Sequence, residues 1–221
     1  MGKIAAFFDV DGTLVKTNVI HAYAYYAVNL PSLSDRFTRA LRLAAALPFY
    51  GLAEAVNRKT FNDLFYKNYE GISEDRLIAL GEELFDNVIR RSIFPKMKEL
   101  VARGREQGIH QVIVTGALDF SMAPLARYLG VDHMQANQLE YRDGFATGTV
   151  RHPLLAGPTK AHWIVKYAKE HDLALDRSFA YADSYSDYPM LSLVGRPCAV
   201  GPDRQLRAAA KAFDWPVLEM D

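Results

Sequence analysis

Two aspartates near the start of the chain, Asp9 and Asp11, have the spacing of a pair of catalytic carboxylates. They follow an apolar run over residues 3–8, which is typical of a buried strand that ends at a polar turn. A carboxylate at such a strand end can attack phosphorus as a nucleophile, and Asp11 is near enough to reach the leaving oxygen. Asp11 could protonate that oxygen and later deprotonate a hydrolytic water. The pair therefore predicts covalent phosphoryl transfer.

Further polar residues could complete a site for this chemistry, provided that a cation joins them. They are Thr115, Lys160, Asp183 and Asp187. Carboxylates gathered in one pocket raise one another's pKa strongly unless something cancels their charge. A hard divalent cation does this, and Mg²⁺ typically binds one or two carboxylates while it keeps several waters. The residue types therefore predict a Mg²⁺ cofactor.

We assign the predicted Mg²⁺ to the carboxylates of Asp9 and Asp183 and to the backbone carbonyl of Asp11. Asp187 is expected just outside these ligands, where it would orient Lys160 or a metal-bound water. Only Asp9 and Asp183 would then touch the ion through their side chains. That arrangement leaves the carboxylate of Asp11 available for acid–base chemistry.

The opposite side of a bound phosphoryl group needs positive charge and hydrogen-bond donors. Lys160 would supply the charge, Thr115 a hydroxyl group, and the turn over residues 10–12 its backbone N–H groups. Gly12 and Gly116 would let the backbone approach closely where a side chain would obstruct it. These residues form the predicted phosphate-binding set.

Strands and helices alternate from residue 111 onwards. Strands are predicted at 111–115, 133–136, 179–182 and 197–200, with helices at 118–129, 159–170, 188–193 and 204–213. A hairpin is predicted within residues 139–150, across Asp143-Gly144. This alternation predicts an α/β fold with a Rossmann-like parallel sheet that has helices on both faces. Ligands bind beyond the carboxyl ends of the strands in such sheets, so the polar residues above should converge there.

The segment between the first two strands has a helical pattern instead. Helices are predicted at 20–28, 33–47, 52–66 and 73–93, with Pro31, Pro48 and Gly71 as breaks. We interpret residues 16–92 as a helical cap inserted into a core formed by residues 1–15 and 93–221. Such a cap would close over the phosphate, exclude water and select the substrate.

The composition narrows the range of partners. Lys plus Arg and Asp plus Glu both number 26, so a neutral chain gives no electrostatic reason to bind nucleic acid. Cys198 is the only cysteine, which excludes an intrachain disulfide and favours a reducing compartment. No apolar run reaches the roughly 18 residues of a membrane span, and the N-terminal one is too short for a secretory signal. We expect a cytoplasmic protein that acts on a small molecule.

Four short segments together resemble the motifs of the haloacid dehalogenase-like hydrolase superfamily. They are Phe7-Phe8-Asp9-Val10-Asp11-Gly12-Thr13-Leu14, Val114-Thr115-Gly116, Lys160, and Ala182-Asp183-Ser184-Tyr185-Ser186-Asp187. The helical insertion and the hairpin segment that starts at Asn137 resemble the phosphoserine-phosphatase-like branch (subfamily IB), whose cap is of the C1 type. The resemblance implies a Mg²⁺-dependent phosphatase. The implied roles are Asp9 as nucleophile, Asp11 as general acid and base, Thr115 and Lys160 as phosphate binders, and Asp183 as metal ligand.

Two positions depart from the pattern of true phosphoserine phosphatases. Their last motif commonly reads Gly-Asp-Gly-x-x-Asp, whereas this chain has Ala182 and Ser184, and we place Ser184 with Asp187 around the metal ligands. The acidic residue that receives the amino group of phosphoserine falls at Asn18, which we assign to the substrate-binding set. A neutral amide cannot pair with an ammonium group as a carboxylate does. Phosphoserine as the natural substrate is therefore in doubt.

Some features of the insertion allow more than one interpretation. The apolar stretch 43–53 could face lipid or a substrate tail, but buried packing or a contact in a homodimer is the simpler interpretation. His21 could line the pocket. The tyrosines of the insertion could form an aromatic wall over the site, or amphipathic helices with their hydroxyls in water. These tyrosines are Tyr23, Tyr25, Tyr26, Tyr50, Tyr66 and Tyr69.

Two other functions are compatible with the sequence. A phosphotransferase would pass the phosphoryl group from the aspartate to a second alcohol. A non-catalytic protein that binds a phosphometabolite is the other alternative, although a binding module has no need of paired aspartates such as Asp9 and Asp11. The sequence leaves the substrate open among phosphoserine, histidinol phosphate, a phospho-alcohol head group and a lysophospholipid.

Overall fold

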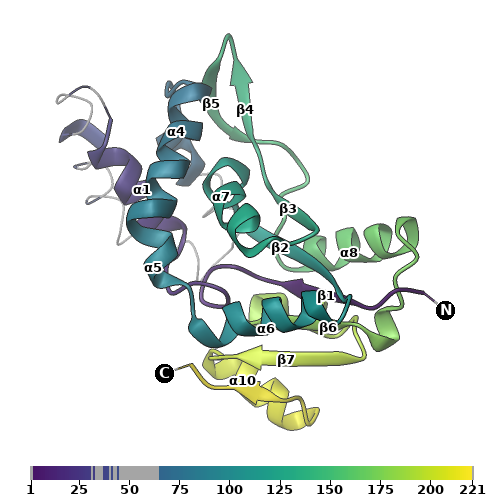
Figure 1. The fold of residues 1–221 in the computed structure, drawn as a ribbon. Helices are drawn as coiled ribbons and strands as arrows, with labels where there is room; N and C mark the ends of the chain where they lie inside the picture. The colour runs from purple at the N-terminus through teal and green to yellow at the C-terminus, as the bar shows by residue number, and fades with distance from the viewer. Residues whose placement is uncertain are drawn as a thin grey trace.

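A six-stranded sheet lies at the centre of the molecule, and each neighbouring pair of its strands is parallel (Figure 1). The computed structural model describes residues 2–30, 32, 37–39, 41, 44 and 65–220. The strand order is β3-β2-β1-β6-β7-β8. The strands are β1 (Ala5–Phe8), β2 (His110–Leu118), β3 (His133–Asn137), β6 (Phe179–Ala182), β7 (Arg196–Val200) and β8 (Val217–Leu218). The predicted Rossmann-like α/β class is confirmed.

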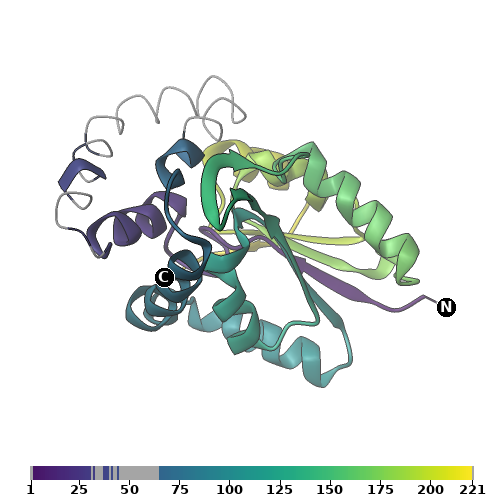
Figure 2. The ribbon, with the colours of Figure 1, turned by 90° about the horizontal axis from the view of Figure 1, so that it is seen from above.

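Helices cover both faces of this sheet, which explains why β1 is apolar throughout. Ala5 and Phe7 pack into one apolar core, and Ala6 and Phe8 pack into the other. Figure 2 shows α8 (light green) on one side of the sheet and α6 and α7 (teal) on the other. The helices from residue 95 onwards are α6 (Pro95–Glu106), α7 (Asp119–Leu129), α8 (Pro158–Glu170), α9 (Tyr188–Leu191) and α10 (Arg204–Ala212), with 3-10 turns η3 (Leu175–Arg177) and η4 (Tyr185–Asp187).

Neither α6 nor β8 is among the elements predicted from the sequence. Pro95 occupies the first turn of α6, so this proline begins a helix and does not only end the preceding one. The buried residues of α6, Met97 and Val101, lie one turn apart among many charged side chains. β8 comprises only two residues at the edge of the sheet, which is too short to produce a periodic pattern.

The described part of the segment between β1 and β2 is mainly helical (Figure 1). Its elements are α1 (Val19–Val28), the 3-10 turn η1 (Lys67–Tyr69), α4 (Glu74–Leu84), the π-helical turn η2 (Phe85–Ile89) and α5 (Arg90–Ser92). The first and last predicted helices are therefore present, the last one with a π-helical turn inside it. The helices predicted at 33–47 and 52–66, and the apolar stretch 43–53, lie almost entirely outside the described residues.

The two segments that connect the sheet to the helical segment, at residues 14–16 and 92–94, lie side by side. The N–H of Lys16 donates to the carbonyl of Ser92 at 2.9 Å, and the N–H of Phe94 donates to the carbonyl of Leu14 at 3.0 Å. The predicted boundaries, after residue 15 and before residue 93, fall at this crossing. The division into a core and a cap with these boundaries stays a prediction.

Aromatic side chains join this helical segment to α7. Tyr26 and Tyr69 both pack against Phe120, with ring centroids 5.7 and 6.2 Å away. The hydroxyls of Tyr26 and Ser121 form a buried hydrogen bond of 2.7 Å. Tyr23, Tyr26, Tyr66 and Tyr69 are all buried, so these phenol groups belong to the packing of the segment instead of extending into water. Tyr50 lies outside the described residues.

The predicted hairpin is present as β4 (Leu139–Arg142) and β5 (Phe145–Val150). Asp143 and Gly144 connect the two strands, both with positive φ, as a tight two-residue turn requires. The hairpin projects from the sheet toward the helical segment (Figure 1). The N–H of Ala146 donates to the carbonyl of Ile72 at 2.9 Å, which ties β5 to the start of α4.

A stack of histidine and aromatic rings makes the stability of this fold dependent on pH. His110 and His133, at the starts of β2 and β3, lie against the ring of Tyr167 with centroids 6.0 and 4.8 Å away. Burial lowers the pKa of both imidazoles below their ordinary value. Nearby positive charges, including His171, lower the pKa further, and Asp132 partly offsets this at His110. The native state therefore binds fewer protons than the unfolded chain just below the ordinary histidine pKa of about 6.5.

We expect His110 and His133 to make a contribution to the free energy of unfolding that rises with pH up to about 6.5 and falls as the pH drops below that value. Asp183, whose pKa burial raises to about 7, contributes in the opposite sense. Urea unfolding at a series of pH values measures this slope. A His110→Gln, His133→Gln double variant should show a smaller slope. His162→Gln, on the exposed side of α8, serves as the matched control and should leave it unchanged. An equal slope in the double variant and the parent would contradict the prediction.

Candidate active site

The carboxyl ends of β1, β2 and β6 open into one pocket of about 270 Å³. It is lined by the polar residues that follow these strands and by residues at the start of α1. The predicted site residues found around it are Asp9, Asp11, Gly12, Asn18, Thr115, Gly116, Lys160, Asp183, Ser184 and Asp187. The parallel sheet therefore brings together residues that are more than 170 positions apart in the sequence, as the strand-end argument predicts.

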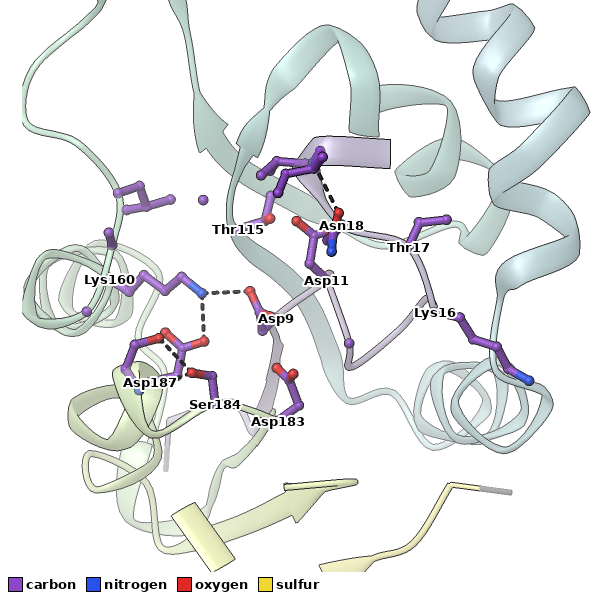
Figure 3. Close-up of a pocket in the computed structure, with 18 of the residues that line it drawn as sticks. Asp9, Asp11, Lys16, Thr17, Asn18, Thr115, Lys160, Asp183, Ser184 and Asp187 are labelled. Atoms are coloured by element: carbon purple, nitrogen blue, oxygen red, sulfur yellow. Dashed lines mark hydrogen bonds and ion pairs between the residues drawn. The ribbon is translucent and has the colours of Figure 1, made fainter. Parts of the chain in front are cut away.

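A buried ion triplet lies on one side of this pocket (Figure 3). The ammonium of Lys160 donates to Asp9 Oδ1 at 2.6 Å and to Asp187 Oδ2 at 2.8 Å. All three side chains are almost completely buried, with exposed fractions of 5 %, 9 % and 3 % for Lys160, Asp9 and Asp187. Burial by itself would lower the pKa of Lys160, but the charges of Asp187 and Asp9 outweigh it and raise that pKa above its ordinary value. Lys160 is therefore charged.

Asp183 lies on the other side of Asp9 (Figure 3). Burial raises the pKa of its carboxyl to about 7, and the negative charge of Asp9 adds to the rise. The hydroxyl of Thr13 donates to Asp183 Oδ1 at 3.2 Å, which opposes this shift only in part. A carboxylate pair under this electrostatic strain is stabilised by a cation placed between its members.

Gly12 makes the approach of Asp183 possible. A Cβ atom at residue 12 would lie 2.2 Å from Asp183 Oδ2, and Gly12 has φ +78, a left-handed value that favours glycine. The N–H of Gly12 donates to the carbonyl of Val15 at 2.8 Å inside the loop. Gly12 therefore contributes space, and its own N–H is used inside the loop. The N–H donors expected from the turn over residues 10–12 stay a prediction.

Thr115 and Gly116 lie where β2 loses its regular pairing with β3, between Val114 and Leu118. Thr115 is buried, and its hydroxyl oxygen accepts a hydrogen bond from the N–H of Ala117 at 3.0 Å. Close packing also favours glycine at residue 116, because a Cβ atom there would lie 3.2 Å from the carbonyl oxygen of Leu155. These contacts bring the end of β2 close to the loop that precedes α8 and Lys160.

The side chain of Asn18, at the start of α1, caps this helix and also lines the pocket. Its side-chain oxygen accepts hydrogen bonds from the N–H groups of Ile20 and His21, at 3.1 and 3.2 Å, and so caps the helix. Backbone N–H groups can only donate, so they fix the orientation of the amide and direct its nitrogen into the pocket, on the side of Asp11 (Figure 3). His21 is exposed and contacts Asn18, so it does not line the pocket as the sequence suggested.

Ser184 supports the turn that presents Asp187. Its hydroxyl oxygen accepts a hydrogen bond from the N–H of Ser186 at 3.3 Å and so caps the 3-10 turn η4, which ends at Asp187. The contact expected between Asp187 and Lys160 is present. Lys16 also borders the pocket, but its amine lies 5.5 Å from the ring centroid of Phe94 and points away from Asp9 (Figure 3).

The residues present fit a divalent cation of the predicted kind. Among the residues that the structure describes, no cluster of three or more His, Cys, Asp or Glu side chains could hold a metal ion. The predicted set needs only two such side chains, those of Asp9 and Asp183, with the Asp11 carbonyl and waters as the other oxygen ligands. The placement of the Asp9 and Asp183 carboxylates around one pocket, with Lys160 in contact with Asp9 and Asp187, favours a cation between Asp9 and Asp183.

Tyr66 lines the pocket, and both Tyr66 and Asn137 make a contact there that the sequence did not predict. The hydroxyl of Tyr66 and the amide of Asn137 both donate to the carbonyl oxygen of Gly116, each at 2.8 Å. Asn137 opens a segment that carries the family resemblance, and Tyr66 is one of the tyrosines that could form an aromatic wall. Neither pattern indicates that the two side chains share one acceptor.

Comparison with known proteins agrees with the arrangement of the site. The sequence model of the haloacid dehalogenase-like hydrolases matches residues 6–192, which is most of the chain. The chain belongs to this family. Its membership confirms the resemblance drawn from the four motifs.

The relatives of this hydrolase include several phosphatases. It is 33 % identical, over 96 % of its length and 70 % of the relative's, to a phosphoserine phosphatase of Mycobacterium tuberculosis (strain ATCC 25618 / H37Rv). It is 25 % identical to a histidinol-phosphatase of Neisseria meningitidis serogroup C (strain 8013), with 98 % of each chain covered. The predicted class, a phosphoric monoester hydrolase of the phosphoserine-phosphatase-like type, is therefore confirmed.

Solved structures show the same fold. A protein of unknown function from Bordetella pertussis Tohama I superposes on this hydrolase with a TM-score of 0.86 and 28 % identity, and the match covers 99 % of each chain. A substrate-bound phosphoserine phosphatase superposes with a TM-score of 0.74 at 18 % identity, over 99 % of this chain and 93 % of that one. The second likeness concerns the fold alone. Among the helices whose residues are described, none has the length and apolarity needed to cross a membrane.

Proposed function

We propose that this hydrolase removes phosphate from a small phosphate monoester with Mg²⁺ as cofactor and with Asp9 as the covalently phosphorylated residue. The observation that carries the proposal is the buried contact of 2.6 Å between Asp9 and Lys160, with Asp183 on the other side of Asp9. A carboxylate attacking a phosphoryl group must overcome the repulsion between two negative charges. Lys160 offsets that repulsion, and so would Mg²⁺ held by Asp9, Asp183 and the Asp11 carbonyl.

The reaction would proceed in two displacements at phosphorus. In the first, an oxygen of Asp9 bonds to phosphorus, the bond to the leaving oxygen breaks, and Asp11 gives that oxygen a proton. In the second, Asp11 takes a proton from water, the water oxygen bonds to phosphorus, and the bond to Asp9 breaks. Phosphate leaves and both aspartates return to their starting states. Thr115 would donate a hydrogen bond to the phosphoryl group throughout.

The side chain of Asn18 favours a substrate whose leaving group carries a hydrogen-bond acceptor. Its oxygen is used by the start of α1, so only the amide N–H₂ group faces the pocket. That group can donate to a hydroxyl, ether or carboxylate oxygen but cannot receive an ammonium group. The named relatives act on phosphoserine and histidinol phosphate, and both compounds therefore belong in a substrate screen beside phosphorylated alcohols without an amine.

Removal of Mg²⁺ should stop the reaction. We expect release of inorganic phosphate from an aryl phosphate to fall at least about a hundredfold in excess EDTA and to return when Mg²⁺ is added back, because the metal neutralises charge in the transition state. A colorimetric phosphate assay across the panel of phosphate monoesters measures this. Full activity in EDTA would contradict the metal assignment. With glycerol added as an acceptor, glycerol phosphate in excess of free phosphate would indicate a phosphotransferase instead.

A further inference from the structure

The peptide group between Gly116 and Ala117 is held at both of its polar ends. Its carbonyl oxygen accepts hydrogen bonds from the hydroxyl of Tyr66 and the amide of Asn137, each at 2.8 Å. Its N–H donates to the hydroxyl oxygen of Thr115 at 3.0 Å. A carbonyl oxygen has two lone pairs, so this one is fully used. The plane of the peptide group is therefore fixed by three contacts at once.

The fixed plane determines where the hydroxyl of Thr115 can donate. Because its oxygen accepts the N–H of Ala117, the hydroxyl hydrogen must point in another direction. The Thr115 hydroxyl donates no hydrogen bond to any residue in the described part of the chain, and Thr115 borders the pocket. Figure 3 shows Thr115 beside Asp11 and Asn18, facing the same space. The hydroxyl is thus oriented as a donor to a bound anion before any ligand arrives.

The two residues that hold the Gly116 carbonyl come from different parts of the fold. Asn137 ends β3, and its side-chain oxygen accepts the N–H of Leu155 at 2.8 Å, in the loop before α8. Tyr66 precedes η1 in the helical segment between β1 and β2. Tyr66 therefore connects the helical segment directly to the part of β2 that carries Thr115.

We propose that Tyr66 is a positioning residue that makes the donor direction of Thr115 depend on the placement of the helical segment. When the segment is seated on the sheet, the phenol hydroxyl holds the carbonyl of Gly116 and Thr115 faces the phosphoryl group. When the segment moves away, the peptide plane loses one of its holds and the Thr115 hydroxyl loses its fixed direction. The inference rests on the proposed function, because it assigns Thr115 to the phosphoryl group.

A double-mutant cycle between Tyr66 and Thr115 tests this coupling. We expect Tyr66→Phe to lower kcat/KM for an aryl phosphate about tenfold, because a misdirected donor loses part of its stabilisation of the transition state. In the Thr115→Val background, the same Tyr66→Phe change should lower kcat/KM less than about twofold, since no hydroxyl remains to be directed. The affinity for inorganic phosphate in the presence of Mg²⁺, measured by titration calorimetry, should show the same pattern even where turnover is too slow to follow.

Tyr26→Phe is the matched control. Tyr26 is also a buried tyrosine of the helical segment whose hydroxyl bonds across to the sheet side, at Ser121, but it has no contact with Gly116. Its effect on kcat/KM should be the same with and without the Thr115 hydroxyl. An equal loss from Tyr66→Phe in both backgrounds, or no loss at all, would overturn the coupling. Absence of Mg²⁺-dependent phosphatase activity in the parent protein would instead remove the proposed function itself.

Discussion

Asp9→Asn is expected to abolish turnover, with a loss of roughly 10⁴-fold or more in kcat for an aryl phosphate. An amide of the same shape cannot form the bond to phosphorus, and the contact partners of residue 9 would otherwise be kept. Lys160 retains its hydrogen bond to Asp187 at 2.8 Å, so the variant should fold. Steady-state release of phosphate measures the loss, and trapping of phosphoprotein by acid quench measures the missing covalent step.

Asp86→Asn is the appropriate control for this variant. Asp86 lies on η2, its side chain is 66 % exposed, and its ion pair with Arg90 is at the surface. It should keep the activity of the parent within about twofold, as is usual for exposed positions away from a site. Thermal unfolding of Asp9→Asn with a midpoint near that of the parent would show that the loss is chemical. Substantial surviving turnover in folded Asp9→Asn would remove Asp9 from the nucleophilic role.

Lys160→Met is expected to destabilise the fold strongly as well as to stop the reaction. Removal of the ammonium leaves the carboxylates of Asp9 and Asp187 buried together with no cation between them. Breaking one partner of a buried ion pair typically costs about 3–5 kcal/mol, which is a large part of the stability of a domain. Urea unfolding in EDTA measures the loss without any contribution from Mg²⁺.

Two comparisons isolate the cause of that loss. Lys166→Met makes the same substitution on the same helix, at a lysine whose side chain is 70 % exposed, and should change the free energy of unfolding by no more than about 0.5 kcal/mol. Asp187→Asn combined with Lys160→Met removes one of the two stranded charges and should restore part of the stability. If Lys160→Met and Lys166→Met prove equally stable, the buried triplet is not held together by the lysine.

The positions of the candidate catalytic side chains were predictable because they depend on strand ends. A parallel sheet places the carboxyl ends of its strands along one edge, so polar residues directly after apolar strands must meet there. Asp9, Thr115 and Asp183 each lie at such a strand end and do meet in one pocket. Lys160 was placed by its position at the first turn of a helix that follows the loop, and the contact with Asp187 followed from charge.

Elements without a periodic pattern or with a misleading one could not be predicted. β8 has two residues and obtains its hydrogen bonds from β7, so tertiary pairing alone defines it. Pro95 starts α6, but in the sequence it could equally mark the end of the preceding helix, because proline is found both at the first turn of helices and just after their ends. The N–H of Gly12 donates to the carbonyl of Val15, and this contact depends on the path of a loop that no sequence pattern specifies.

The sequence by itself determined the family, the sheet and the identity of the charged residues, because these follow from local patterns of apolar, acidic and glycine residues. Only the tertiary structure decided how the neutral residues are arranged around them. Tyr66 and Asn137 lie 50 and 21 residues from Gly116, yet both donate to its carbonyl oxygen. A hydrogen bond between a side chain and a distant backbone atom leaves no periodic trace in the sequence, since any residue type can supply the backbone acceptor.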